Sequence, residues 1–139
     1  MPSKTSILRN LEKAKKVSKF SNFPRQKVGC VLMLKNKMLA IGYNSTKTYP
    51  IQKKYNQFRK FSRIDKTTHN GFIHAEMMCL QRTKYLKINW EDVVLYVARI
   101  KVDGSQGLAK PCPACIKAIK ERGVGTIYYT LEETGFDIL

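Results

Sequence analysis

Two short motifs, far apart in the chain, constrain its fold more than any other feature. The first is Ile73-His74-Ala75-Glu76, and the second is Pro111-Cys112-Pro113-Ala114-Cys115. One imidazole and two thiolates are donors that zinc prefers in proteins, so we expect the two motifs to meet at one ion. Because Cys112 and Cys115 are three residues apart, one helical turn directs both sulfurs at the same point. A helix beginning at each motif places the ion between two helix N-termini, where thiolates are favoured.

The number of ligands indicates a catalytic rather than a structural zinc site. His74, Cys112 and Cys115 leave the fourth tetrahedral position to water, and zinc lowers the pKa of such a water toward neutrality. Glu76 follows His74 by two residues, and positions i and i+2 of a helix do not share a face. We therefore expect Glu76 to reach the water, as a general acid and base, and not the metal.

In this order, the His-x-Glu and Pro-Cys-x-x-Cys motifs resemble those of the cytidine/deoxycytidylate deaminase superfamily. The resemblance covers nearly the whole chain and is closest to deoxycytidylate-type deaminases, including phage-encoded relatives; tRNA adenosine deaminases share the core. It implies an α/β fold, a three-layer α/β/α sandwich with a mixed, mostly buried central sheet. It also implies a Zn²⁺ cofactor, assembly into homo-oligomers, and a catalytic Glu76 that moves protons from water to the ring nitrogen and the leaving ammonia.

Two other interpretations of the cysteines remain open. A redox pair accounts for Cys112 and Cys115 but leaves the His-x-Glu motif unexplained. A closed structural zinc site needs a fourth ligand. Cys79 is a poor fourth ligand, because five residues along a helix from His74 turn it away by about 140°. Cys30 lies in an apolar run that is typical of a protein core.

Length and charge limit the class of protein. A chain of 139 residues suits one domain, and we expect a single deaminase domain over residues 1–139 with a basic, aromatic insert at 45–72. Without an apolar run of about 18 residues or a signal-peptide pattern, we expect a cytoplasmic protein, in the host cell if phage-encoded. The net charge of +16 indicates an anionic partner, either a nucleotide phosphate or single-stranded nucleic acid. The alternative is that the lysines only make the surface more soluble. We expect no membrane partner.

The N-terminal part of the chain predicts a helix followed by a β-hairpin. Apolar residues recur at helical spacing in the first segment, which Ser3 or Thr5 caps. The residues of this apolar stripe are Ile7, Leu8, Leu11, Ala14 and Val17. Two strands follow, Val28–Leu34 and Met38–Tyr43, with a turn between them.

The remaining chain predicts helices that alternate with strands. The expected elements are helix Ile73–Lys84, strand Val93–Ala98, helix Pro111–Arg122 and strand Val124–Thr130. Gly123 ends the second of these helices. Residues Gly135–Leu139 form either an antiparallel return or no strand, because Leu131–Thr134 is too short for a parallel crossover.

Several residues near the hairpin and the first motif are expected at the site. Gly29 and Gly42 allow close backbone approach there. In the resembling family an Asn after Gly-Tyr hydrogen-bonds the substrate sugar, so the resemblance assigns that role to Asn44. A turn-forming Asn at the end of a strand explains Asn44 equally well. Ala75, within the first motif, is also expected to contact the substrate.

Segment 45–72 is the most individual part of the chain. Its cations are interleaved with aromatic side chains, a composition that suits phosphate contacts and base stacking, or a lid anchored by its aromatics. The substrate contacts expected from it are Lys47, Lys53, Lys54, Tyr55 and Arg59. Residues Ile51–Arg63 are expected to hold a short helix, and His69 is expected to be an ordinary loop residue.

These features predict hydrolytic deamination of cytosine to uracil in a free (deoxy)cytidine nucleotide such as dCMP. The first alternative, which the charge and the insert favour, is a deaminase acting on cytosine or adenine in single-stranded DNA or RNA, including tRNA. The second alternative is a non-catalytic nucleic-acid-binding module on the same scaffold. The intact Glu76 argues against it, since loss of activity is expected to remove the proton shuttle.

Overall fold

The computed structural model describes residues 2–47, 49–56 and 72–139, so Arg59 and His69 lie outside the described residues. The helices and strands are α1 (Lys4–Ser18), β1 (Lys27–Leu34), β2 (Lys37–Tyr43), α2 (Pro50–Tyr55), α4 (Ala75–Arg82), η2 (Trp90–Asp92), β3 (Val93–Ile100), β4 (Gln106–Gly107), α5 (Pro113–Arg122), β5 (Thr126–Thr130) and β6 (Phe136–Ile138). No helix within these ranges is both long enough and apolar enough to span a membrane.

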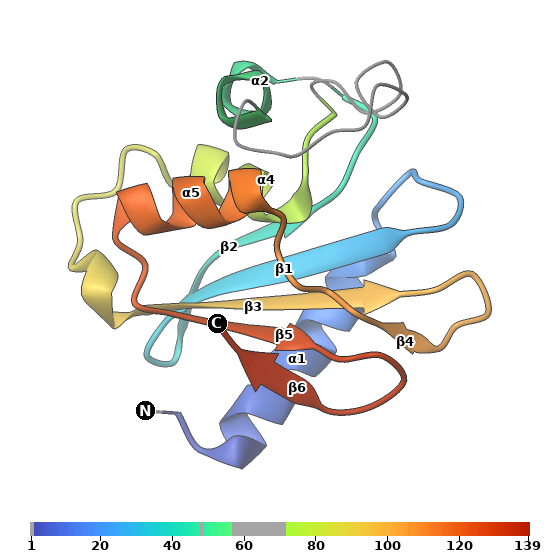
Figure 1. The fold of residues 1–139 in the computed structure, drawn as a ribbon. Helices are drawn as coiled ribbons and strands as arrows, with labels where there is room; N and C mark the ends of the chain where they lie inside the picture. Colours follow the sequence, from blue (N-terminus) through green and yellow to red (C-terminus); the bar gives the residue numbers. More distant parts are fainter. Residues whose placement is uncertain (1, 48, 57–71) are drawn as a thin grey trace.

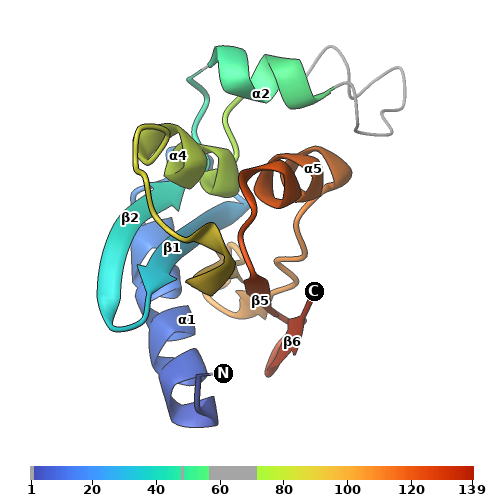
Figure 2. The same cartoon turned by 90° about the vertical axis from the view of Figure 1, so that its left-hand side faces the viewer.

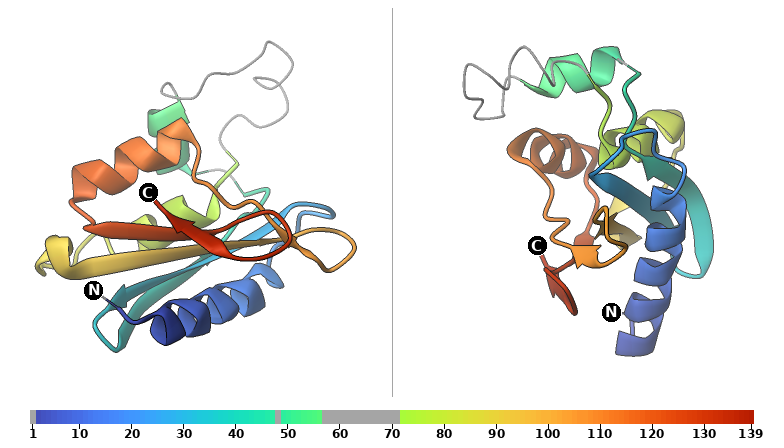
Figure 3. Two further views of the ribbon diagram at one scale, coloured as in Figure 1. Left: turned by 60° about the horizontal axis from the view of Figure 1, so that its bottom comes forward. Right: turned by 90° about the vertical axis from the view of Figure 1, so that its right-hand side faces the viewer.

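A mixed sheet with helices on both faces confirms the predicted three-layer α/β/α fold (Figure 1). The strand order is β2-β1-β3-β5-β6, and short β4 pairs with β3. Strands β3 and β5 are parallel, and the other pairs are antiparallel. Helix α1 lies against one face, and α4 and α5 lie side by side on the other (Figure 3). Figure 2, viewed from the side, shows the same separation of the helices by the sheet.

Helix α1 forms as predicted because its cap and its apolar stripe agree. The side chain of Ser3 accepts a hydrogen bond from the backbone N of Ser6 at 3.1 Å. The stripe is buried against one face of the sheet, where it contacts residues such as Tyr96 and Tyr128. Leu8 was predicted within the stripe, but it is 44% exposed. Its neighbour Ile7 already faces the sheet, and one residue along a helix turns Leu8 by about 100°.

Strand β3 lies inside the sheet, between β1 and β5, as its continuous apolar sequence predicts. Parallel pairing of β3 with β5 requires a crossover, and α5, which lies between the two strands in the chain, supplies it. Gly123 ends α5 in the left-handed conformation, with φ of 97°. Strand β6 returns antiparallel to β5, which is the first of the two possibilities expected for this segment.

Gly42 and Gly29 allow close backbone approach on opposite faces of the sheet. A Cβ atom at Gly42 would lie 2.2 Å from the carbonyl oxygen of Ala75, at the start of α4. A Cβ atom at Gly29 would lie 2.2 Å from the carbonyl oxygen of Ala14, in α1. The prediction for Gly42 is therefore confirmed. For Gly29 it is wrong about the neighbour, because β1 alternates its faces and turns this residue toward α1.

Candidate active site

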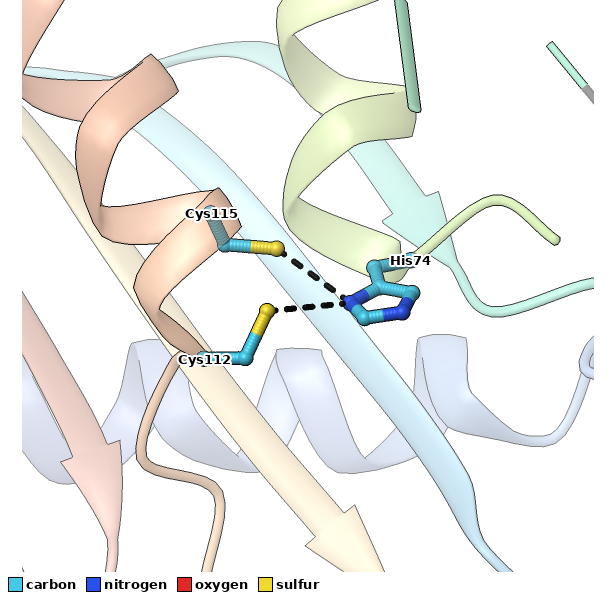
Figure 4. A group of neighbouring side chains, drawn as sticks. All are labelled: His74, Cys112 and Cys115. Carbon is cyan, nitrogen blue, oxygen red and sulfur yellow. Dashed lines mark hydrogen bonds between the residues drawn. The ribbon is translucent and has the colours of Figure 1, made fainter. Parts of the chain in front are cut away.

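His74, Cys112 and Cys115 come together where the first turns of α4 and α5 meet. His74 is the N-cap of α4, Cys112 is the N-cap of α5, and Cys115 lies in the first turn of α5. His74 Nδ1 lies 3.5 Å from Cys112 Sγ and 3.4 Å from Cys115 Sγ. Figure 4 shows both sulfurs pointing toward this nitrogen. The predicted meeting of the two motifs at two helix N-termini is what the structure shows.

These three residues fit a zinc ion. Zinc bonds of about 2.3 Å to sulfur and 2.0–2.1 Å to nitrogen at tetrahedral angles separate the two donors by roughly 3.6 Å. The observed separations of 3.4 and 3.5 Å are close to that value. Among the described residues, this group of possible ligands contains three side chains and no fourth. That leaves one position for water, as catalytic zinc sites do.

The pKa values of the two thiol groups are shifted in opposite directions. Hydrogen bonding with Cys115 lowers the pKa of Cys112 to about 4, helped by His74 and opposed by burial. Burial raises the pKa of Cys115 well above its ordinary value. A metal ion therefore has to displace a proton from Cys115 as it binds, which makes its affinity increase with pH.

Among the residues that the structure describes, no fourth ligand supports the alternative of a closed structural site. Cys79 is buried in α4, and its sulfur lies 2.8 Å from Cys30 Sγ within the core. Cys30 also contacts the carbonyl oxygen of Ala75 at 3.0 Å. The sequence placed Cys30 in the core and turned Cys79 away from His74, and the structure confirms both expectations.

Gln52 of α2 supports His74, a role that the sequence analysis did not identify. The backbone N of His74 donates a hydrogen bond to Gln52 Oε1 at 2.9 Å. The other end of the amide is also engaged, since Gln52 Nε2 donates to Asn56 Oδ1 at 2.8 Å. The side chain is fully buried, so these hydrogen bonds fix its orientation. A single Gln in a basic segment carries no pattern that predicts this contact.

Glu76 lies in the first turn of α4 and is buried. Burial raises the pKa of its carboxyl group, although His74 acts in the opposite direction. A carboxyl group whose pKa moves toward neutrality is better suited to exchange protons in both directions. Glu76, His74 and Cys112 line one cavity, so a molecule bound there meets all three.

The cavity has a volume of 530 Å³. Its walls come from the loop after α1, the ends of β1 and β3, the start of α4 and the segment before α5. Asn44 and Ala75, both predicted from the sequence, lie in this wall. Asn44 Oδ1 accepts from the backbone N of Val28 at 2.9 Å, and Asn44 Nδ2 donates to the carbonyl oxygen of Gln26 at 2.6 Å.

The structure does not bring the other expected substrate contacts to this cavity. Lys47, Lys53 and Lys54 are exposed and lie outside its wall. Tyr55 is buried, and its hydroxyl donates a short hydrogen bond to the carboxylate of Glu121 in α5. Helix α2 directs Tyr55 toward the core, whereas Lys53 and Lys54 of the same helix lie on its exposed side.

Three cations of the wall were not predicted as site residues: Arg25, Arg99 and Lys110. Arg25 precedes β1, Arg99 lies near the end of β3, and Lys110 directly precedes the Pro-Cys-x-x-Cys motif. In the sequence they are single cations among many. Only the position of Lys110 beside a ligand gives a signal that could have identified it.

Comparison with known proteins bears on both fold and chemistry. The family model described as the cytidine and deoxycytidylate deaminase zinc-binding region matches residues 4–131. No curated protein matches the chain significantly in sequence. Among solved structures, the dCMP deaminase of cyanophage S-TIM5 in its apo form shares 24% identity, with a TM-score of 0.65 over 94% of this chain and 86% of that one.

Two further structures share the fold. The same cyanophage enzyme in complex with dCMP and dUMP shares 24% identity, with a TM-score of 0.66 over 95% of this chain and 85% of that one. Cytidine deaminase from Burkholderia pseudomallei shares 17% identity, with a TM-score of 0.62 over 95% of this chain and 90% of that one. At such identities the likeness establishes the fold alone.

Proposed function

The chain belongs to the cytidine and deoxycytidylate deaminase family, and we propose that it deaminates cytosine to uracil in a free (deoxy)cytidine nucleotide such as dCMP. The observation that carries this proposal is one cavity of 530 Å³ whose wall contains His74, Glu76 and Cys112. Cavities of about 300–1,000 Å³ hold small-molecule ligands. The cyanophage relative with bound dCMP and dUMP supports a nucleotide as the substrate.

We propose His74, Cys112 and Cys115 as the zinc ligands. Zinc, when bound, supplies the Lewis acidity that makes water a nucleophile at neutral pH. Gln52 holds the backbone of His74, and the N-terminus of α5 stabilises the two thiolates. The helix ends and the buried amide therefore fix the ligand set before the substrate arrives.

Glu76 is the proposed proton carrier. Its carboxylate takes one proton from the attacking water and gives it to the ring nitrogen, while the water oxygen bonds to the amino-bearing carbon. It then takes the remaining proton from the new hydroxyl and gives it to the amino group. The bond from carbon to that nitrogen breaks, ammonia leaves, and the oxygen stays as the carbonyl of uracil. Burial, which raises the pKa of Glu76, favours the protonated form that the second transfer requires.

Asn44 is proposed to position the sugar. Its side chain already accepts from Val28 and donates to Gln26, so the amide plane is fixed in the cavity wall. One hydrogen of Nδ2 remains to donate to a sugar hydroxyl. Ala75 lines the same cavity between His74 and Glu76, and it is proposed to contact the substrate.

We propose that residues 1–139 form one deaminase domain, in which 45–72 is an insert. The family model spans residues 4–131 without division. Within the insert, α2 contacts α4 and α5, and Gln52 reaches the site itself. The described part of the insert therefore supports the metal ligands from outside.

The direct test is an activity panel with purified, zinc-loaded protein. Cytidine, dCMP, dCTP, single-stranded DNA and tRNA are incubated separately, and ammonia and the uracil or hypoxanthine product are measured. We expect turnover of a free cytosine nucleotide. Glu76→Ala should retain zinc and lose about 10²–10⁴-fold in rate, the range of general acid–base catalysis. Product formed only within an oligonucleotide or tRNA, and none from free nucleotides, would overturn the proposal.

A further inference from the structure

Three cations from outside the basic insert line the active-site cavity. Among its described wall residues, Arg25, Arg99 and Lys110 are cationic, and Glu76 is the one carboxylate. Arg25 and Lys110 are exposed, whereas Arg99 is partly buried. The cluster thus has one interior cation and two at the rim, within the cavity that also holds the proposed catalytic residues.

Strand pairing holds Arg99 in place, and no carboxylate among the described residues forms an ion pair with it. It pairs with Val28 of β1 on one side and with Gly107 of β4 on the other. Its side chain runs across Gly107, where an added Cβ would lie 3.1 Å from Arg99 Cδ and 3.2 Å from Arg99 Nε. Because residue 107 is glycine, the aliphatic part of the Arg99 side chain has room to lie across it.

The guanidinium has unused hydrogen-bonding capacity. Arg99 Nε is buried and has no hydrogen-bond partner among the described residues. The neighbouring Glu132 forms its ion pair with Lys101 instead. A buried donor left unpaired is destabilising, so such groups are generally hydrogen-bonded to a ligand or to water.

We infer that Arg99, assisted at the rim by Arg25 and Lys110, binds the phosphate of the substrate nucleotide. The inference rests on the proposed function, because it assigns a part of the same cavity. A planar guanidinium binds phosphate oxygens through two parallel hydrogen bonds, and a partly desolvated one does so more strongly than an exposed lysine. The exposed Lys53 and Lys54 of α2 lie outside the cavity wall and do not contribute.

The test compares dUMP with deoxyuridine, which differ only in the phosphate and do not react. Dissociation constants are measured by calorimetry for the zinc-loaded wild type and for Arg99→Gln, Arg99→Lys and Lys53→Gln. We expect the wild type to prefer dUMP, and Arg99→Gln to weaken dUMP by about 10–100-fold, as loss of a charged hydrogen-bonding partner does. The affinity of Arg99→Gln for deoxyuridine should stay within about twofold of the wild-type value. The dUMP affinity of Arg99→Lys should lie between those of the wild type and Arg99→Gln. Lys53→Gln should bind both ligands as the wild type does.

The other outcomes are equally informative. A wild type without preference for dUMP, or a preference that survives Arg99→Gln, overturns the inference. So does an equal loss for both ligands, or a loss confined to Lys53→Gln, which assigns the phosphate to the insert. Single-stranded DNA bound through Arg99, with no binding of dUMP, overturns it in favour of a polymer. If dUMP binds through Arg99 but dCMP releases no ammonia, the inference stands and the proposed function fails. Arg99→Lys keeps the charge and stem, so it provides the answer if Arg99→Gln does not fold.

Discussion

Replacing Gly42 by alanine tests whether contact between the sheet and α4 positions the active site. The added Cβ would lie 2.2 Å from the carbonyl oxygen of Ala75 and 3.0 Å from the backbone N of Cys79. Both are backbone atoms of α4, so rotation of a side chain does not relieve the clash. Helix α4 has to move away from the sheet by about 1 Å, and His74 and Glu76 flank Ala75 and move with it.

The structure supplies a matched control in Gly29→Ala. Its added Cβ would lie 2.2 Å from the carbonyl oxygen of Ala14 and 2.4 Å from the backbone N of Ser18. The clash is as severe, but it displaces α1 on the opposite face of the sheet. Overpacking of this kind costs about 1–3 kcal/mol of unfolding free energy, and we expect both variants to lose that much.

Only Gly42→Ala should damage the chemistry. A misplacement of about 1 Å lowers catalytic rates by roughly 10²-fold, so kcat/KM should fall by that factor relative to Gly29→Ala. Urea denaturation measures the stability of both variants, competition with a chelator measures their zinc affinity, and ammonia release measures turnover of dCMP. Equal zinc affinity and equal turnover in the two variants would refute the argument that this contact positions His74 and Glu76.

Individual contacts of Glu76, Gln52 and Tyr55 have consequences that can be measured. Burial raises the pKa of the Glu76 carboxyl above its ordinary 4.5, so the folded zinc-free protein binds this proton more tightly than the unfolded chain does. The folded state should therefore lose stability as pH rises through the raised pKa. Thermal unfolding in the presence of a chelator should show this loss in the wild type and not in Glu76→Gln. Gln52→Leu removes the acceptor of the His74 N–H. It should lower the free energy of unfolding, measured with urea, by about 1–3 kcal/mol, and it should weaken zinc binding. Unchanged zinc affinity would contradict the supporting role of Gln52. Tyr55→Phe removes the hydrogen bond to Glu121 and should cost about 1 kcal/mol of stability, whereas a raised KM for dCMP would show that Tyr55 contacts substrate after all.

Most of the fold could be predicted because local patterns and packing agree. The apolar stripe of α1, the buried run of β3 and the glycine that ends α5 each produced the expected element. The errors were at element ends and at single positions. Helix α4 begins at Ala75 rather than Ile73, because His74 has an extended backbone as the N-cap.

The structure brings the predicted metal ligands together, whereas the described lysines of the insert lie outside the cavity. The basic insert was expected to bind the phosphate, since cations and aromatics are dense there. In the structure, Lys53 and Lys54 are exposed, and the cations that line the cavity among the described residues come from three other segments. Density of charge along a sequence says nothing about which cations share a cavity.

By itself, the sequence determined the family and the residues that can bind zinc. Zinc requires particular donor atoms at close spacing, and the His-x-Glu and Pro-Cys-x-x-Cys motifs encode those donors locally. Tertiary structure alone decided how the site is supported and charged. Gln52 reaches His74 from α2, Gly42 admits α4 to the sheet, and Arg99 enters the cavity from β3. These contacts join residues that are distant in the chain and that strand pairing and helix packing bring together. Local sequence patterns do not predict such contacts.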